Sequence, residues 1–133
     1  MEFLEFISQV AEMTGATRTE DPEVGEVVLA LDTPGGRGQE VRACEFTEDG
    51  RAYVRFYTSI GRQGEVPRPL LLTALELNAS LAHGAFALYE GRVALVDTLD
   101  LAYANSEEGA RILSYLGRMA DTFEKMAYGV DRS

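Results

Sequence analysis

The chain contains few of the residues from which most catalytic and metal sites are built. Its 133 residues include one cysteine, one histidine, one lysine and no tryptophan. Cys44 cannot form a disulfide within the chain, which fits a reducing compartment and the role of a small buried apolar residue. His83 would have to share a metal with carboxylates alone, because there is no second imidazole and no thiol pair. We therefore expect no bound metal and no cofactor.

Long apolar runs and a basic leader are also missing. No apolar stretch approaches the roughly 18 residues needed to span a bilayer. The first five residues include two glutamates, and the first basic residue is Arg18, unlike the basic start of a secretory signal. These absences predict a cytoplasmic protein that does not bind membranes.

Positive charge is scarce and scattered. The formal net charge is −10 at pH 7, and the acidic excess is largest over residues 1–26. Without a basic stripe the chain cannot contact phosphates in number, so direct nucleic-acid binding is disfavoured. A partner protein with a basic or apolar exposed segment is compatible with this charge, although acidity also serves solubility.

The length and the 46% hydrophobic content fit one globular domain over residues 1–133. Helical spacing of apolar residues predicts an amphipathic helix over 3–14, and polar residues 17–23 are expected to form a connector. Three strands are expected next, over 27–31, 40–47 and 51–60. The second and third are joined by Asp49-Gly50, a strong hairpin signal. Val41 and Ala43 should face away from Cys44 and Phe46, with either a bulge or two buried faces in that strand.

The second half begins with a helix over 70–81 that is apolar around nearly its whole circumference, which is typical of burial on more than one side. Two strands over 84–89 and 92–99 flank the turn at Glu90-Gly91. A long amphipathic helix should start after an N-cap at Asn105 or Ser106 and stop at Gly129. The predicted fold is α+β, in the order α-β-β-β-α-β-β-α, with helices packed on an antiparallel sheet.

No arrangement of residues indicates catalysis. Ser80 and His83 could join a distant aspartate, but no nucleophile-elbow sequence supports a triad. The loop Gly35–Gly38 lacks the spacing and the Lys-Ser/Thr pair of a phosphate-binding loop. Asp97 and Asp100 are explained by a strand end and a cap. We expect no catalytic residues and no enzyme, and a hydrolase that uses His83 stays as an unsupported alternative.

One strand face is more informative. Tyr53, Arg55 and Tyr57 alternate with the apolar residues of the third strand and should share the face opposite the core. Tyrosine and arginine are enriched in protein interfaces because they bury much area and keep polar tips. These three residues are the predicted partner-binding residues. A helix covering this face is the competing interpretation.

The order of elements and the residues of the second half resemble a known family. Leu75-Glu76-Leu77-Asn78-Ala79, then Gly84-Ala85-Phe86-Ala87-Leu88 and Glu90-Gly91-Arg92-Val93-Ala94-Leu95, resemble type III secretion chaperones of the CesT-like class and, equally, YbjN-type sensory transduction regulators. By residue pattern the resemblance covers about 70–99.

The resemblance implies a homodimeric, non-enzymatic adaptor without cofactor that binds and shields a segment of another protein. It places the dimer contact on the second helix, at Leu71, Leu72 and Leu75. The YbjN-type alternative is a regulatory protein that contacts a stress-response or nucleic-acid-handling partner.

Overall fold

The computed structural model describes residues 1–33, 36 and 38–128, and within these residues a single sheet and three α-helices form an α+β unit. The helices are α1 (Phe3–Thr14), α2 (Arg68–Leu77) and α3 (Ser106–Tyr128), and the strands are β1 (Thr17–Asp21), β2 (Glu26–Asp32), β3 (Gly38–Glu48), β4 (Arg51–Arg62), β5 (Ala85–Tyr89) and β6 (Arg92–Asp100). The sheet is antiparallel with the strand order β1-β2-β3-β4-β6-β5. The predicted class and the packing of helices on an antiparallel sheet are therefore confirmed.

One strand was missed. Residues 17–21, predicted to be part of a connector, form the edge strand β1, paired with β2 from Thr17↔Ala30 to Asp21↔Glu26. Its side chains are almost all exposed. It therefore lacks the apolar alternation by which a strand is recognised in sequence. Such polar edges limit unwanted pairing with other chains.

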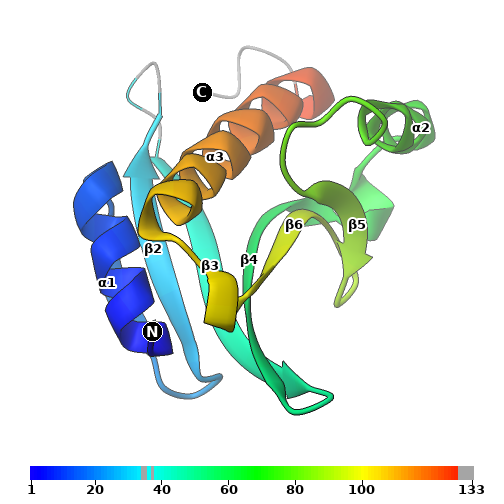
Figure 1. Cartoon of the computed structure of the whole chain (residues 1–133). Helices are drawn as coiled ribbons and strands as arrows, with labels where there is room; N and C mark the ends of the chain where they lie inside the picture. Colours follow the sequence, from blue (N-terminus) through cyan, green and yellow to red (C-terminus); the bar gives the residue numbers. More distant parts are fainter. Residues whose placement is uncertain (34–35, 37, 129–133) are drawn as a thin grey trace.

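Helices α1 and α3 pack on the same face of the sheet, and Figure 1 shows α3 crossing it diagonally with α1 alongside. The core between these layers is formed by fully buried apolar side chains, including Phe6, Val10, Phe56, Leu113 and Leu116. The strands contribute alternate residues: Val54 and Phe56 of β4 face the helices, as do Val41 and Ala43 of β3. The predicted alternation of β3 is regular through its pairing with β4, and the bulge lies instead between Ser59 and Gly61, where β4 meets β6.

Helix α2 is shorter than predicted and less buried. It spans Arg68–Leu77 instead of 70–81, and the path continues through Leu81 as tight turns with bonds such as Ser80 N–H to Leu77 O. Only Ala74 of this helix is buried, and it belongs to the main core. Most of the apolar circumference of α2 is therefore exposed or half-buried in a single copy of the chain.

Helix α3 begins where the sequence predicted. The Asn105 side-chain oxygen accepts bonds from the Glu107 and Glu108 N–H groups, at 2.8 and 3.2 Å, so Asn105 is the N-cap. The expected stop at Gly129 lies outside the described residues, as do Pro34, Gly35 and Arg37 of the loop before β3.

Candidate functional site on the helix-free face of the sheet

The face of the sheet opposite α1 and α3 carries no helix in the described chain. Tyr53, Arg55 and Tyr57 all project from this face, because they alternate along β4 with the buried Val54 and Phe56. Each of the three is half-buried by neighbours within the sheet. The structure thus brings the three predicted partner-binding residues to one surface, which we call the open face.

A cation–aromatic stack occupies one end of the open face. The rings of Phe46 and Tyr53, directly opposite in the β3–β4 ladder, stack with centroids 5.3 Å apart. The Arg55 guanidinium lies over the Phe46 ring, 4.4 Å from its centroid, and Arg55 Nε donates to Thr98 Oγ1 at 3.1 Å. These contacts hold the guanidinium close to the sheet, which lowers the conformational entropy that it would lose on binding a partner.

A second cluster is built around Glu26. Its carboxylate accepts bonds from Tyr57 Oη at 2.7 and 2.8 Å and from Arg42 at 3.1 Å. Arg42 also pairs with Asp21 at 3.2 Å, and the Tyr57 ring contacts that of Tyr89, with centroids 4.6 Å apart. Burial, followed by the bond to Glu26, raises the pKa of the Tyr57 phenol well above its usual range. Tyr57 therefore stays a neutral donor that fixes the β2–β4 spacing of this surface.

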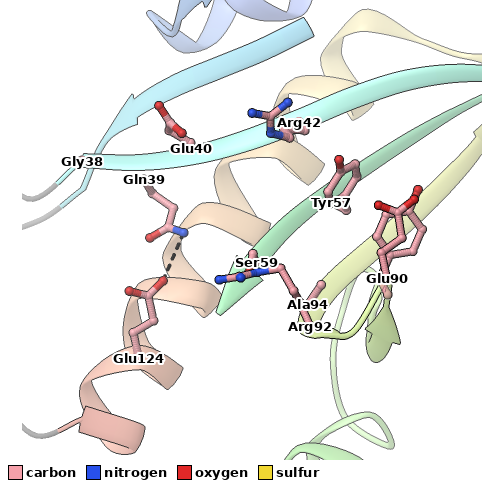
Figure 2. A pocket seen from close by; sticks show the side chains of 11 residues that line it. Gly38, Gln39, Glu40, Arg42, Tyr57, Ser59, Glu90, Arg92, Ala94 and Glu124 are labelled. Carbon is pink, nitrogen blue, oxygen red and sulfur yellow. Dashed lines mark hydrogen bonds between the residues drawn. The ribbon is translucent and has the colours of Figure 1, made fainter. Parts of the chain in front are cut away.

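A groove of about 420 Å³ continues the open face past this cluster, toward the start of β3 and the turn between β5 and β6 (Figure 2). Its walls are mixed: Arg42 and Arg92 line it together with Glu40, Glu90 and Glu124. At one end of the groove, the buried Gln39 amide donates to Thr58 Oγ1 and to Glu124 Oε1 and so connects β3 to α3. The groove offers polar contacts of both signs beside an aromatic surface.

Ser80 and His83, which were weighed for a catalytic triad, each make a separate local contact. The Ser80 hydroxyl donates to the Leu77 carbonyl at 3.2 Å, while the His83 ring forms a T-shaped contact with the Tyr115 ring, with centroids 5.3 Å apart. Burial raises the pKa of the half-buried Cys44 thiol, which keeps it protonated and unreactive. Among the described residues, no group of three or more His, Cys, Asp and Glu side chains is placed to hold a metal ion. None of the helices in the described chain is long and apolar enough to cross a membrane.

The predicted dimer residues have different surroundings. Leu72 and Leu75 are exposed, at 52% and 64%, whereas Leu71 is half-buried against the core. Leu88 of β5 is a further exposed leucine, at 60%.

Sequence reasoning missed Phe46, Tyr89, Arg42 and Glu26 as members of the open face. Phe46 could have been found from the Asp49-Gly50 turn. A tight hairpin at this turn places Phe46 opposite Tyr53 and Cys44 opposite Arg55. Tyr89 and Glu26 lie on strands that are not adjacent to β4, and no local signal connects them to Tyr57.

No protein-family model and no curated protein matches this sequence. Solved structures do match the fold. A chain of the crystal structure of the ExsC–ExsE complex is 17% identical, with a TM-score of 0.61 over 96% of this chain and 97% of that chain. The crystal structure of YbjN from E. coli, described as a candidate transcription regulator, is 15% identical with a TM-score of 0.45, over 98% of this chain and 92% of that chain. The predicted type III secretion chaperone-like fold is therefore confirmed.

Proposed function

We propose that this chain is a non-enzymatic, homodimeric adaptor that binds and shields a segment of a partner protein in the manner of a chaperone. The observation that carries the proposal is the open face, where Tyr53, Arg55 and Tyr57 share a helix-free sheet surface. Tyrosine and arginine supply large contact areas with polar tips, which is the composition of interface hot spots. The fold likeness to a chain of the ExsC–ExsE complex, a complex of two proteins, is in keeping with this role.

The partner segment is apolar or basic. Phe46, Tyr53 and Tyr57 offer aromatic surface, and Glu26, Glu40 and Glu90 border it. The net charge of −10 would steer a basic chain toward the protein and speed its association. The same charge opposes direct binding to nucleic acids and to anionic membranes, and the proposed location is the cytoplasm.

The homodimer is proposed to form through α2. Leu72 and Leu75 would be covered by the second copy, with the half-buried Leu71 at the border of the contact. Covering these side chains removes apolar area from water, at about 25 cal/mol per Å² before the costs of association. Dimer formation would leave the open face of each copy available, because α2 packs against the core and not on that face.

Affinity capture tests the adaptor role. The immobilised chain would be exposed to lysate of its own cells at two salt concentrations, and captured proteins identified by mass spectrometry. The comparison is between the wild type, a double variant Tyr53→Ala and Arg55→Ala, and the control Arg62→Ala, whose side chain is 76% exposed at the end of β4.

We expect one dominant partner that the control retains and the double variant loses by about tenfold or more, as for hot-spot residues. A partner captured equally by all three proteins would mean that the open face does not bind it. The absence of any enriched partner would argue against a dedicated adaptor.

A further inference from the structure

A second cleft lies on the helical side of the molecule, away from the open face. It has a volume of about 340 Å³ and is enclosed by the end of α1, the turn before β5 and the middle of α3. Its chemistry comes from Met13, His83, Arg111, Ser114, Tyr115 and Arg118. We call it the α3 cleft. The proposed adaptor role of the open face does not involve it.

The charge of the α3 cleft is opposite to that of the chain. Some arginines elsewhere, such as Arg42 and Arg51, contact a carboxylate, whereas Arg55 and Arg92 donate to hydroxyl groups. Within the described residues, Arg111 and Arg118 form no ion pair and no hydrogen bond, and Arg118 lies over the Tyr115 ring, 6.0 Å from its centroid. The two guanidinium groups are exposed, and they give the lining of this cleft a positive charge although the chain has a net charge of −10.

Some polar groups next to the cleft are already hydrogen-bonded within the protein. Near the end of α1, Ala11 O accepts from the Gly15 and Ala16 N–H groups, and Val10 O accepts from Thr14 Oγ1 at 2.9 Å. The Tyr115 hydroxyl accepts a bond from the Ala82 N–H at 3.0 Å, which ties the turn to α3. The N–H donors of Arg111 and Arg118 are therefore available to a ligand in this cleft.

The spacing of the arginines selects the kind of anion. Arg111 and Arg118 are seven residues apart on one helix, which corresponds to about 10.5 Å along its axis. In a segment with the extended polyproline II conformation, acidic side chains three positions apart point the same way and are separated by about 9 Å, at roughly 3.1 Å per residue. Met13 is 52% exposed at the opposite wall and offers an apolar contact between the two charges.

We propose that the α3 cleft binds an extended acidic segment of a partner protein, with one carboxylate on Arg111, one on Arg118 and an apolar side chain against Met13. This proposal does not depend on the adaptor role of the open face, since the two surfaces lie on opposite sides of the sheet. If both are used, the protein contacts two chemically different segments at the same time.

The test uses a short fluorescent peptide with two glutamates three positions apart and a leucine between them, and a matched peptide with glutamines instead. Binding is measured by fluorescence anisotropy at about 0.15 M salt, where charges beyond a Debye length of roughly 8 Å are largely screened. Backbone amide shifts in an NMR titration report where the peptide binds. The variants are Arg111→Gln with Arg118→Gln, and the charge-matched control Arg62→Gln with Arg68→Gln, at exposed positions near α2.

We expect the glutamate peptide to shift amides of residues 82–83 and 110–118 and to bind the Arg111 and Arg118 double variant about tenfold or more weakly than wild type, as for charge-assisted contacts. The control should bind within about twofold of wild type. Equal losses in both double variants would reduce the effect to net charge and overturn the proposal. Equal binding of the glutamine peptide, no binding, or full displacement by millimolar inorganic phosphate would overturn it as well.

Discussion

The side-chain amide of Asn78 satisfies both main-chain groups of Phe86. Asn78 Oδ1 accepts from the Phe86 N–H at 2.7 Å, and Asn78 Nδ2 donates to the Phe86 carbonyl at 3.1 Å. β5 is an edge strand, and both groups of Phe86 face away from β6. Asn78 therefore occupies the place of a neighbouring strand, fastening the end of α2 to the sheet and covering part of the edge.

Replacing Asn78 with alanine should destabilise the fold by about 1–2 kcal/mol, because two main-chain groups lose their partner. Chemical denaturation would measure the loss, and amide hydrogen exchange would show faster exchange of Phe86 than of residues in β3. Asn78→Asp is the matched control: it keeps an acceptor for the N–H but places a carboxylate against the Phe86 carbonyl, and so should not restore stability. Full stability in the alanine variant would mean that water replaces the amide without cost.

The contact between α1 and α3 depends on Gly109. A Cβ at this position would lie 2.7 Å from Phe6 Cζ and 2.8 Å from Val10 Cγ2, both in the buried core. We expect Gly109→Ala to lower the free energy of unfolding by about 1–3 kcal/mol through overpacking, although alanine is the better helix former. Thermal unfolding measures the change in stability. The control is Gly64→Ala, because a Cβ at Gly64 meets nothing within 4 Å. A stabilised Gly109→Ala protein would contradict the tight packing.

Leu75→Asp should abolish the proposed dimer with little effect on folding of a single copy. Leu75 is 64% exposed, so the charge is solvated in the monomer, whereas in an apolar contact it would be unpaired and buried at a cost of several kcal/mol. Analytical ultracentrifugation gives the result directly. Leu4→Asp, at a leucine of α1 that is 51% exposed, is the matched control and should leave association unchanged. A dimer that survives Leu75→Asp places the contact elsewhere.

The raised pKa of Tyr57 predicts a loss of stability in alkali. The folded state holds the phenol proton to higher pH than the unfolded chain, whose phenol titrates near the ordinary value of 10.0. The stability from the neutral phenol is therefore fully present below about pH 10 and declines as pH rises toward the folded pKa. Denaturation at several pH values should show this decline, and Tyr57→Phe should make it shallower. Tyr103→Phe, at a residue that is 74% exposed, serves as the control and should keep the wild-type decline.

Periodic apolar residues were enough to predict all three helices and five of the six strands. The face of Tyr53, Arg55 and Tyr57 followed from alternation alone, because Val54 and Phe56 are unmistakably apolar. β1 was missed since its pairing rests on main-chain bonds to β2 and hardly on buried side chains. Local pattern thus predicted the elements that bury apolar area and missed the one that does not.

The contacts among the side chains of the open face could not be predicted from the sequence. Glu26 and Tyr57 are 31 residues apart, and Tyr89 reaches Tyr57 only because β5 and β6 return beside β4. The exposure of Leu72 and Leu75 could not be predicted either. The sequence of an apolar helix is the same whether its own core or a second copy covers it.

The strand order divides the sheet into two parts that are joined by one strand pairing. β1 to β4 form a consecutive meander, β5 and β6 form a hairpin, and the two meet along the β4–β6 pairing from Tyr53↔Asp100 to Arg62↔Arg92. Between them the chain passes through residues 63–84, which include α2. A break in that stretch would cut no sheet hydrogen bond, so the fragments before and after it are suited to reassociation as a split protein. The same stretch is then where an inserted sequence would disturb the sheet least.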